Sequence, residues 1–254
     1  MTNNDEDKYK GAENCLLNNN ELCIYRFLCP KEVIMKKRIL IGKLDSGYVL
    51  LDDLKDIKIA YSFGINGRID FDKDLADRNI DVYMYDQKIK SPPYKNNRFH
   101  WKKIGLGGKS DKNNLLKPLD ELIKENGHSS EKNMILKINS ELFDWDALKD
   151  LPENNLKQFK YITLELYFKN NAKLYYDVLK KLNKTHQVFY LSCHNGAKII
   201  TFGDNRVCEI LDVSYIIREN NTFIKDSSIY PIPEFNKGKE KSEMNLNIFK
   251  LFDP

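Results

Sequence analysis

The stretch Lys58-Ile-Ala-Tyr-Ser-Phe-Gly-Ile-Asn-Gly67 decides the fold. A short apolar run that breaks into Gly64-Ile-Asn-Gly67 is typical of a strand followed by a tight loop, because glycine tolerates backbone angles that other residues avoid. Residues 71–79 then show helical spacing, and a second apolar run, Val82-Tyr-Met-Tyr-Asp86, follows them. The order strand, loop, helix, strand predicts a βαβ unit with an acid at the tip of its second strand.

That acid suits a nucleoside ligand. Asp86 lies about twenty residues beyond the glycine loop, where a carboxylate can accept hydrogen bonds from both ribose hydroxyls. The loop is not a GxGxxG fingerprint, so it argues only weakly for NAD, and a plain turn is its alternative explanation. A helix cap is the competing role for Asp86, and also the role that we expect for Asp70 or Asp72.

Length and composition predict one large α/β domain. The chain has 254 residues, 41% of them hydrophobic and 31% charged, which is ordinary for a globular protein. We expect a flexible arm over residues 1–20, a single domain with an N-terminal helical cap over 21–230, and a tail over 231–254. The net charge of +4 is spread along the chain, so no nucleic-acid partner is indicated.

The cysteines and the N-terminus favour a cytoplasmic protein. The five cysteines are odd in number and lack CxxC spacing, so neither a zinc site nor a full disulfide framework is indicated. The first residues are acidic and polar, unlike a signal peptide, and no stretch approaches the roughly 18 apolar residues of a membrane span. We therefore expect a reducing compartment and no membrane insertion.

The remaining segments extend the α/β pattern. Residues 21–37 predict one or two short helices around Pro30, and residues 38–51 predict a hairpin that turns at Asp45-Ser-Gly47. Further strands are predicted over 98–105, 134–139, 161–167 and 187–194, with helices over 115–126, 145–151 and 173–183. After residue 187 the β-type runs follow one another without a helix, which predicts a mostly parallel sheet with an antiparallel end.

Polar residues follow most of these strands at their carboxyl ends. In an open α/β sheet, ligands bind outside these ends. The converging groups are Ser62 to Asn66, Asp86 and Gln87, Gly105 to Gly107, Asn139 to Glu141, Glu165 to Tyr167, and His194 with Asn195. Gly105 to Gly108 is a loop in this interpretation, and no lysine follows it at P-loop spacing.

Glu165 is the most informative of these residues. It interrupts the apolar run Ile162-Thr-Leu-Glu-Leu166 of a central strand, and a buried carboxylate is costly unless it is paired or bound. Together with His194 and Glu141 it can form a general-base pair or a site for a divalent metal ion. A structural salt bridge, or an ordinary hydrogen-bonded network, is the alternative.

Four segments, taken in order, resemble the FkbM-type and methyltransferase-like class I S-adenosylmethionine (SAM) enzymes. They are Asp45-Ser-Gly-Tyr-Val-Leu-Leu-Asp-Asp53, Tyr61-Ser-Phe-Gly-Ile65 with Asp70-Phe-Asp72, Val82-Tyr-Met-Tyr-Asp86, and Met134-Ile-Leu-Lys-Ile-Asn-Ser-Glu-Leu-Phe-Asp-Trp145. The resemblance covers residues 38 to 200 approximately. It implies a Rossmann-like sheet of seven strands, six parallel and one reversed, flanked by helices.

The resemblance also implies a set of cofactor-binding residues. Ser62, Phe63, Gly64, Ile65 and Asn66 would line the methionine end of SAM, and Asp86 with Gln87 would hold the ribose. Gly105, Leu106 and Gly107 would lie near the adenine, and Asp45 and Tyr48 would close over the cofactor. Asn139 departs from the acid usual in the family, which leaves Glu141 as the carboxylate at this strand end.

The resemblance therefore implies a SAM-dependent O-methyltransferase. We expect it to act on a sugar hydroxyl, such as that of a nucleotide-activated sugar for a capsule or other surface glycan. His194 is the expected base, with Glu141 and Glu165 as orienting or metal-ligating groups. The alternatives are methylation of a small phosphorylated metabolite, a non-catalytic binding protein of the same fold, and, less favoured, an NAD-dependent oxidoreductase. Metal dependence and homo-oligomer formation are left open.

Overall fold

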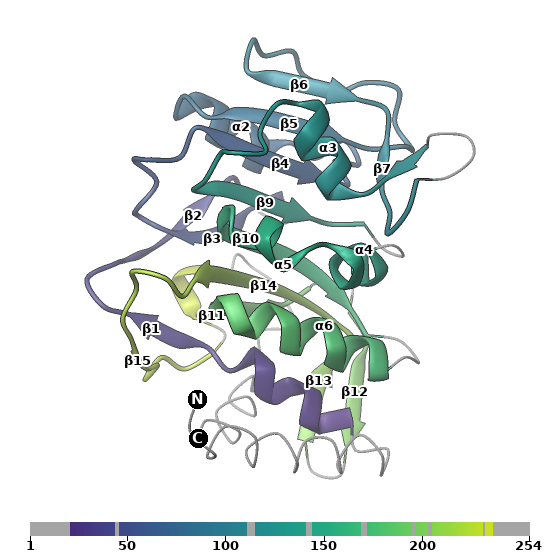
Figure 1. Cartoon of the computed structure of the whole chain (residues 1–254). Helices are drawn as coiled ribbons and strands as arrows, with labels where there is room; N and C mark the ends of the chain where they lie inside the picture. The colour runs from purple at the N-terminus through teal and green to yellow at the C-terminus, as the bar shows by residue number, and fades with distance from the viewer. Residues whose placement is uncertain are drawn as a thin grey trace.

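A seven-stranded sheet forms the centre of the molecule (Figure 1). The computed structural model of the chain describes residues 21–43, 46–110, 115–140, 144–168, 172–194, 197–202, 205–230 and 232–235. The strand order is β11-β14-β10-β9-β4-β5-β6. The bounds are β4 Ile59–Phe63, β5 Asp81–Tyr85, β6 Phe99–Lys102, β9 Met134–Ile138, β10 Phe159–Tyr167, β11 His186–Cys193 and β14 Ile210–Ile217.

Six of these strands run in one direction, and β14 runs against both of its neighbours. The predicted mostly parallel sheet with an antiparallel end is therefore confirmed, and the arrangement is Rossmann-like. The central strands are apolar because they are covered on both faces. Every residue of β9 is buried, as are the first eight of the nine residues of β10.

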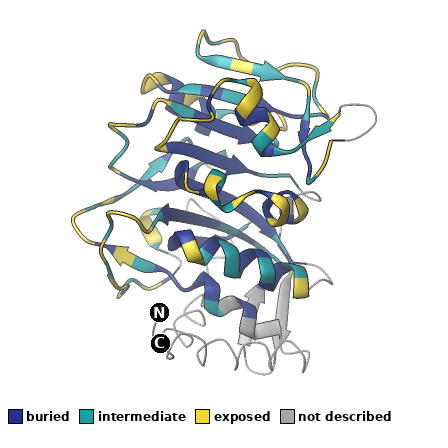
Figure 2. Ribbon diagram, viewed as in Figure 1, coloured by how far each residue is buried: buried dark blue, intermediate teal, exposed yellow. Residues whose placement is uncertain are grey.

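Four helices lie in front of the sheet in the view of Figure 1. They are α3 Leu119–Glu125, α4 Asp144–Asp150, α5 Glu153–Leu156 and α6 Ala172–Thr185. Figure 2 shows that the described residues of these helices are buried on the side towards the strands and exposed on the other. This pattern follows the helical spacing of their apolar residues, such as Val178, Leu179 and Leu182 in α6.

The helix α2 Asp70–Asp77 and the hairpin of β2 Arg38–Ile41 and β3 Tyr48–Leu51 lie behind the sheet in the same view. The hairpin confirms the prediction over residues 38–51. The rings of Tyr48 and Phe71 pack edge to face, with centroids 5.2 Å apart. Gly42 permits this approach, because a Cβ atom there would lie 2.7 Å from the Phe71 nitrogen. The hairpin and α2 thus form one unit over the sheet.

Two local predictions need comment, because pairing with another segment of the chain overrides the local pattern in both places. One or two short helices were expected around Pro30, and one 3-10 helix, Glu21–Leu28, precedes the proline. After it, β1 Lys31–Val33 pairs with β15 Phe223–Lys225. Likewise Gly105–Leu106 is not a loop but strand β7, which pairs with β8 Leu116–Lys117. The following helix therefore begins at Leu119 rather than Leu115.

The last third contains the expected consecutive strands. The hairpin of β12 Ile199–Phe202 and β13 Asn205–Cys208 lies between β11 and β14 in sequence, and a short 3-10 helix, Pro233–Phe235, ends the described residues. A disulfide joins Cys193 at the end of β11 to Cys208 at the end of β13, with Cα atoms 5.8 Å apart. Nothing in the cysteine spacing predicts this bond. Cys29 is also buried, and its Sγ lies 3.9 Å from the carbonyl oxygen of Pro30.

The helices that the structure describes are all too short or too polar to cross a membrane. The predicted arm over residues 1–20 and most of the predicted tail lie outside the described part of the chain.

Candidate functional site

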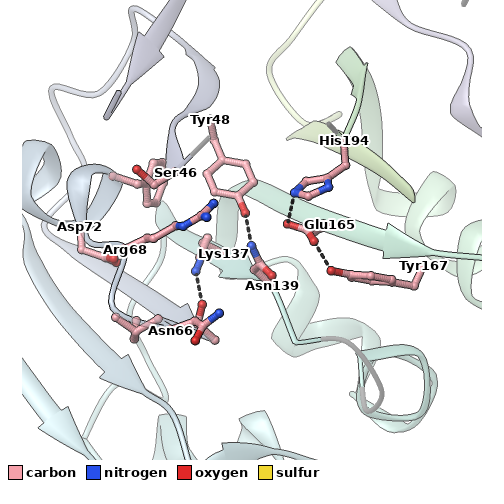
Figure 3. A pocket seen from close by; sticks show the side chains of 13 residues that line it. Ser46, Tyr48, Asn66, Arg68, Asp72, Lys137, Asn139, Glu165, Tyr167 and His194 are labelled. Atoms are coloured by element: carbon pink, nitrogen blue, oxygen red, sulfur yellow. Dashed lines mark hydrogen bonds and ion pairs between the residues drawn. The ribbon is translucent and has the colours of Figure 1, made fainter. Parts of the chain in front are cut away.

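A pocket of about 200 Å³ opens at the carboxyl ends of β4, β9 and β10 (Figure 3). This is the point where the strand order reverses, because the chain proceeds from β4 to β5 on one side and later to β9 on the other. Open α/β sheets bind their ligands at such switch points. The lining residues are Ser46, Tyr48, Gly64, Ile65, Asn66, Arg68, Phe71, Asp72, Lys137, Asn139, Glu165, Tyr167 and His194.

The loop after β4 forms the floor of the pocket, and Gly64 is required there. Its φ is +73°, and a Cβ atom on it would lie 1.7 Å from the carbonyl oxygen of Asn139. The Asn139 backbone N–H in turn donates to the carbonyl of Phe63 at 3.1 Å. The ends of β4 and β9 are therefore locked together in a way that only glycine allows.

Asp86 holds this loop in place. One carboxylate oxygen accepts the backbone N–H of Asn66 at 2.9 Å, and the other accepts that of Lys88 at 2.7 Å. The side chain is almost fully buried and does not line the pocket. Each carboxylate oxygen keeps a further lone pair. Ribose binding by Asp86 therefore stays a prediction, beside a structural role that the sequence pattern did not indicate.

Lys137 and Asn139 form the wall contributed by β9. The Lys137 ammonium donates to the carbonyl oxygens of Phe63 at 3.1 Å and Gly64 at 2.8 Å, although the side chain is almost fully buried. The Asn139 amide donates to the Tyr48 hydroxyl at 3.1 Å. Burial, with the nearby acids Asp212 and Glu165, raises the pKa of Tyr48, so its phenol stays protonated.

Glu165 and His194 form the opposite wall. The Tyr167 hydroxyl donates to one oxygen of Glu165, and His194 Nε2 lies 3.9 Å from the other (Figure 3). Burial raises the pKa of Glu165, as does the neighbouring Asp212, while His194 and Tyr167 act in the opposite direction. The His194 side chain is 24% exposed and Glu165 only 4%. The imidazole thus faces the pocket while the carboxylate lies behind it, the arrangement that suits a general base and its orienting group.

Asp72 is the unexpected member of the site. It was expected as a helix cap, but α2 has Ile69 at its N-cap position and no side-chain cap, and Asp72 points inward. The side chain is fully buried, and neither carboxylate oxygen has a hydrogen-bond partner among the described residues. Burial raises its pKa, which Lys137 and the Ser62 hydroxyl oppose. The Ser62 hydroxyl is near, but no hydrogen bond of normal geometry joins it to the carboxylate.

The structure brings eight of the predicted residues together around the pocket, and these are Tyr48, Gly64, Ile65, Asn66, Asn139, Glu165, Tyr167 and His194. Ser62 and Phe63 lie beneath it in β4, while Asp86, Gln87, Gly105, Leu106 and Gly107 do not line it. Gln87 and Gly105 do meet, since a Cβ atom on Gly105 would lie 2.3 Å from the Gln87 side-chain oxygen. Asp45, Glu141 and Asn195 lie outside the described residues.

Sequence reasoning missed five pocket residues as site candidates: Ser46, Arg68, Phe71, Asp72 and Lys137. A signal existed for Lys137, because it interrupts the buried run Met134-Ile-Leu-Lys-Ile138 just as Glu165 interrupts its own strand. For Asp72, the position beside Phe71 in an amphipathic helix was compatible with an inward direction, but a first-turn acid is also the ordinary pattern of a solvent-facing helix start.

The predicted metal site is only partly represented. Glu165 and His194 are close, but within the described ranges no group of three or more His, Cys, Asp or Glu side chains is arranged to hold a metal ion. Because Glu141 is not among those residues, a metal ion held by Glu141, Glu165 and His194 stays a prediction.

The comparisons with known proteins leave the site to be interpreted from its own geometry. No protein-family model matches this chain, and no curated protein matches it.

Proposed function

We propose that the chain is a SAM-dependent O-methyltransferase that acts on a sugar hydroxyl. The observation that carries this proposal is the pocket at the switch point of the sheet, which has a glycine loop on one side and a carboxylate–imidazole pair on the other. The loop side offers space for a nucleoside-linked cofactor, and the pair offers a base for an acceptor hydroxyl. The six parallel strands and one reversed strand agree with the sheet that the sequence resemblance implies.

The pocket residues fit the chemical groups of SAM. The orphaned carboxylate of Asp72 suits a positively charged group, and the buried Lys137 ammonium suits a negatively charged one. SAM supplies an activated methyl group on a sulfonium centre when bound. The protein would then hold an acceptor oxygen in line with the methyl carbon. This positioning can supply most of the rate enhancement.

His194 is the proposed general base. Its imidazole would accept the proton of the acceptor hydroxyl as the new oxygen–carbon bond forms, and Glu165 would stabilise the resulting imidazolium. Tyr167 fixes Glu165 by its hydrogen bond, which keeps the carboxylate directed at the imidazole. The acceptor that we propose is a nucleotide-activated sugar for a capsule or other surface glycan, because Arg68 in the pocket wall suits a diphosphate.

Calorimetry with SAM and with NAD tests the cofactor. We expect SAM to bind in the micromolar range or tighter, and an affinity weaker than millimolar would exclude the proposal. Release of S-adenosylhomocysteine with a panel of nucleotide sugars, with and without EDTA, then tests the acceptor and metal dependence. Turnover on small phosphorylated metabolites alone would favour the first alternative, and tight SAM binding without any turnover would favour a non-catalytic binding protein.

A histidine variant tests the mechanism. His194→Ala is expected to lower turnover by roughly 100-fold while SAM affinity stays within twofold, because the imidazole acts on the acceptor. His100→Ala is the matched control. His100 lies on the edge strand β6, where it stacks on Tyr83 of β5, and it does not line the pocket. Unchanged turnover in His194→Ala would remove His194 from the mechanism.

A further inference from the structure

Asp72 is a fully buried carboxylate for which the described residues supply no hydrogen bond of normal geometry. Both of its oxygens lack hydrogen-bond partners, and the side chain lines the pocket. Buried polar groups in native proteins are almost always hydrogen-bonded, and a buried carboxylate is more costly than a neutral group. An orphaned carboxylate at a pocket wall therefore needs an explanation in terms of what the pocket binds.

Among the described side chains with unsatisfied buried atoms, three belong together, and Tyr176 and Tyr215 are the other two. Ser62 in β4 and Thr163 in β10 also have buried hydroxyl oxygens without partners in the described structure. Both pair in register with Lys137, so the three side chains form one row on the same face of the sheet. The charge of Lys137 and the hydroxyl of Ser62 both lower the pKa of Asp72. The Asp72 carboxyl therefore lies close to this row of side chains.

Lys137 lowers the pKa of Asp72 through its charge but makes no hydrogen bond to this carboxylate. The Lys137 ammonium donates to the carbonyl oxygens of Phe63 and Gly64, and no hydrogen bond links it to the carboxylate. Two aromatic side chains, Tyr48 and Phe71, line the same pocket and pack against each other. A carboxylate beside aromatic rings is the environment that proteins use for ligands with a positive charge.

We propose that Asp72 binds the ammonium group of the ligand, so that this pocket selects compounds carrying a primary amine. The inference rests on the proposed function, which identifies the compound as SAM. The group of SAM that contacts Asp72 is then its α-ammonium. The negative charge opposite this ammonium thus comes from the first turn of α2. The sequence had predicted that the glycine loop lines the methionine end of SAM.

A set of three ligands on two variants tests this contact by calorimetry. S-Adenosylhomocysteine has the ammonium and the carboxylate, decarboxylated SAM keeps only the ammonium, and 5′-methylthioadenosine has neither. In Asp72→Asn we expect a roughly 10- to 100-fold loss of affinity for the first two ligands, the value of one charge-assisted contact, and a change under twofold for the third.

The control is Asp77→Asn, the same substitution on the same helix at an exposed side chain that pairs with Lys73. It should leave all three affinities unchanged. An equal loss for all three ligands in Asp72→Asn, or no loss for decarboxylated SAM, would overturn the ammonium contact.

A second measurement separates a binding role from a structural one. If Asp72 serves the ligand, the free Asp72→Asn protein should unfold at a higher denaturant concentration than the wild type, and a lower midpoint would overturn the proposal. Failure of the proposed function is a different result, because the wild-type protein would then bind none of the three adenosyl compounds. A wild-type protein that binds all three, with Asp72→Asn equal to it, defeats only the inference about Asp72.

Discussion

Buried polar side chains occur at both ends of the central strands, and the two ends differ in how these groups are satisfied. At the amino end, the Gln158 amide donates to the carbonyl oxygens of His128, Ser129 and Glu131 at 2.9–3.2 Å. His186, at the start of β11, has its Nε2 2.9 Å from the carbonyl of Phe159. Around the pocket at the carboxyl end, Ser62, Asp72 and Thr163 have no such partners among the described residues, and the buried hydroxyls of Tyr176 and Tyr215 also lack them.

The contrast locates the functional end of the sheet. A fully hydrogen-bonded buried group contributes to a specific fold, whereas an unsatisfied one costs free energy and persists where it serves another purpose. Gln158 and His186 therefore belong to the scaffold, whereas the unsatisfied polar groups at the pocket suit a ligand. Four experiments follow, each of which can break or sharpen this difference.

The largest effect is expected at Gly64. Gly64→Ala places a Cβ atom 1.7 Å from the Asn139 oxygen at a φ of +73°, so it should lower the free energy of unfolding by about 4 kcal/mol or more. Gly67→Ala is the control, because Gly67 has the same φ but no atom within 4 Å of its Cβ position, and it should cost about 1 kcal/mol. Urea denaturation measures both. Equal losses would show that the contact between β4 and β9 is not tight.

At the amino end, His186 should make stability depend on pH. Burial lowers the pKa of His186 from 6.5 to about 4, so the unfolded chain binds a proton that the native protein excludes. Stability is therefore complete above about pH 6.5 and falls by about 3 kcal/mol as the pH drops to about 4.

Denaturation midpoints at pH 7 and pH 4.5 test this expectation. His186→Gln should remove that part of the pH dependence, whereas His100→Gln, on an exposed side chain, should leave it unchanged. A wild-type protein equally stable at both pH values would mean that the amino end is less tightly packed than its hydrogen bonds suggest.

The disulfide gives the carboxyl end a constraint of its own. Cys193 precedes His194 directly, and its bond to Cys208 closes a loop with a sequence separation of 15 residues. Reduction should lower the free energy of unfolding by about 2–3 kcal/mol, since the reduced unfolded chain gains freedom. The melting temperature with and without dithiothreitol measures this effect.

The sensitivity to dithiothreitol should disappear in the Cys193→Ser/Cys208→Ser variant and persist in Cys29→Ala, which leaves this disulfide in place. If reduction leaves the melting temperature of the wild-type protein unchanged, the disulfide does not stabilise this end of the sheet.

The smallest effect, and the one of opposite sign, is expected for Asp72. Because burial raises the pKa of Asp72, the ionised side chain destabilises the folded protein above its ordinary titration range, and this cost disappears as the pH falls and the carboxyl is protonated. Asp72→Asn should therefore raise the free energy of unfolding at pH 7 by about 1 kcal/mol.

Urea denaturation of Asp72→Asn beside Gln158→Ala tests the comparison directly. The first should gain stability, and the second should lose it because the amide makes three hydrogen bonds to backbone carbonyls. Losses in both variants would remove the distinction between the two ends.

The cost of burying a charge applies equally to Glu165 and Lys137. Both are charged residues inside apolar strands, and both are buried in the pocket wall. No local sequence pattern indicates that the two side chains lie near each other. Lys137 and Glu165 are on neighbouring strands, and their register is fixed only when β9 and β10 pair. The sequence is equally uninformative about Asp72. An acid in the first turn of a helix gives the same sequence pattern whether its side chain faces water or the sheet.

The sequence by itself determined the βαβ start, the alternation of strands and helices, the hairpin before it and the polar groups at the strand ends. These depend on periodicity and turn residues within short windows. Only the tertiary structure decided that β14 inserts between β10 and β11, that Cys193 bonds Cys208, and that Asp72 meets the row of Ser62 and Lys137. Each of these joins residues distant in the chain, and their meeting depends on the packing of the whole sheet rather than on any local preference.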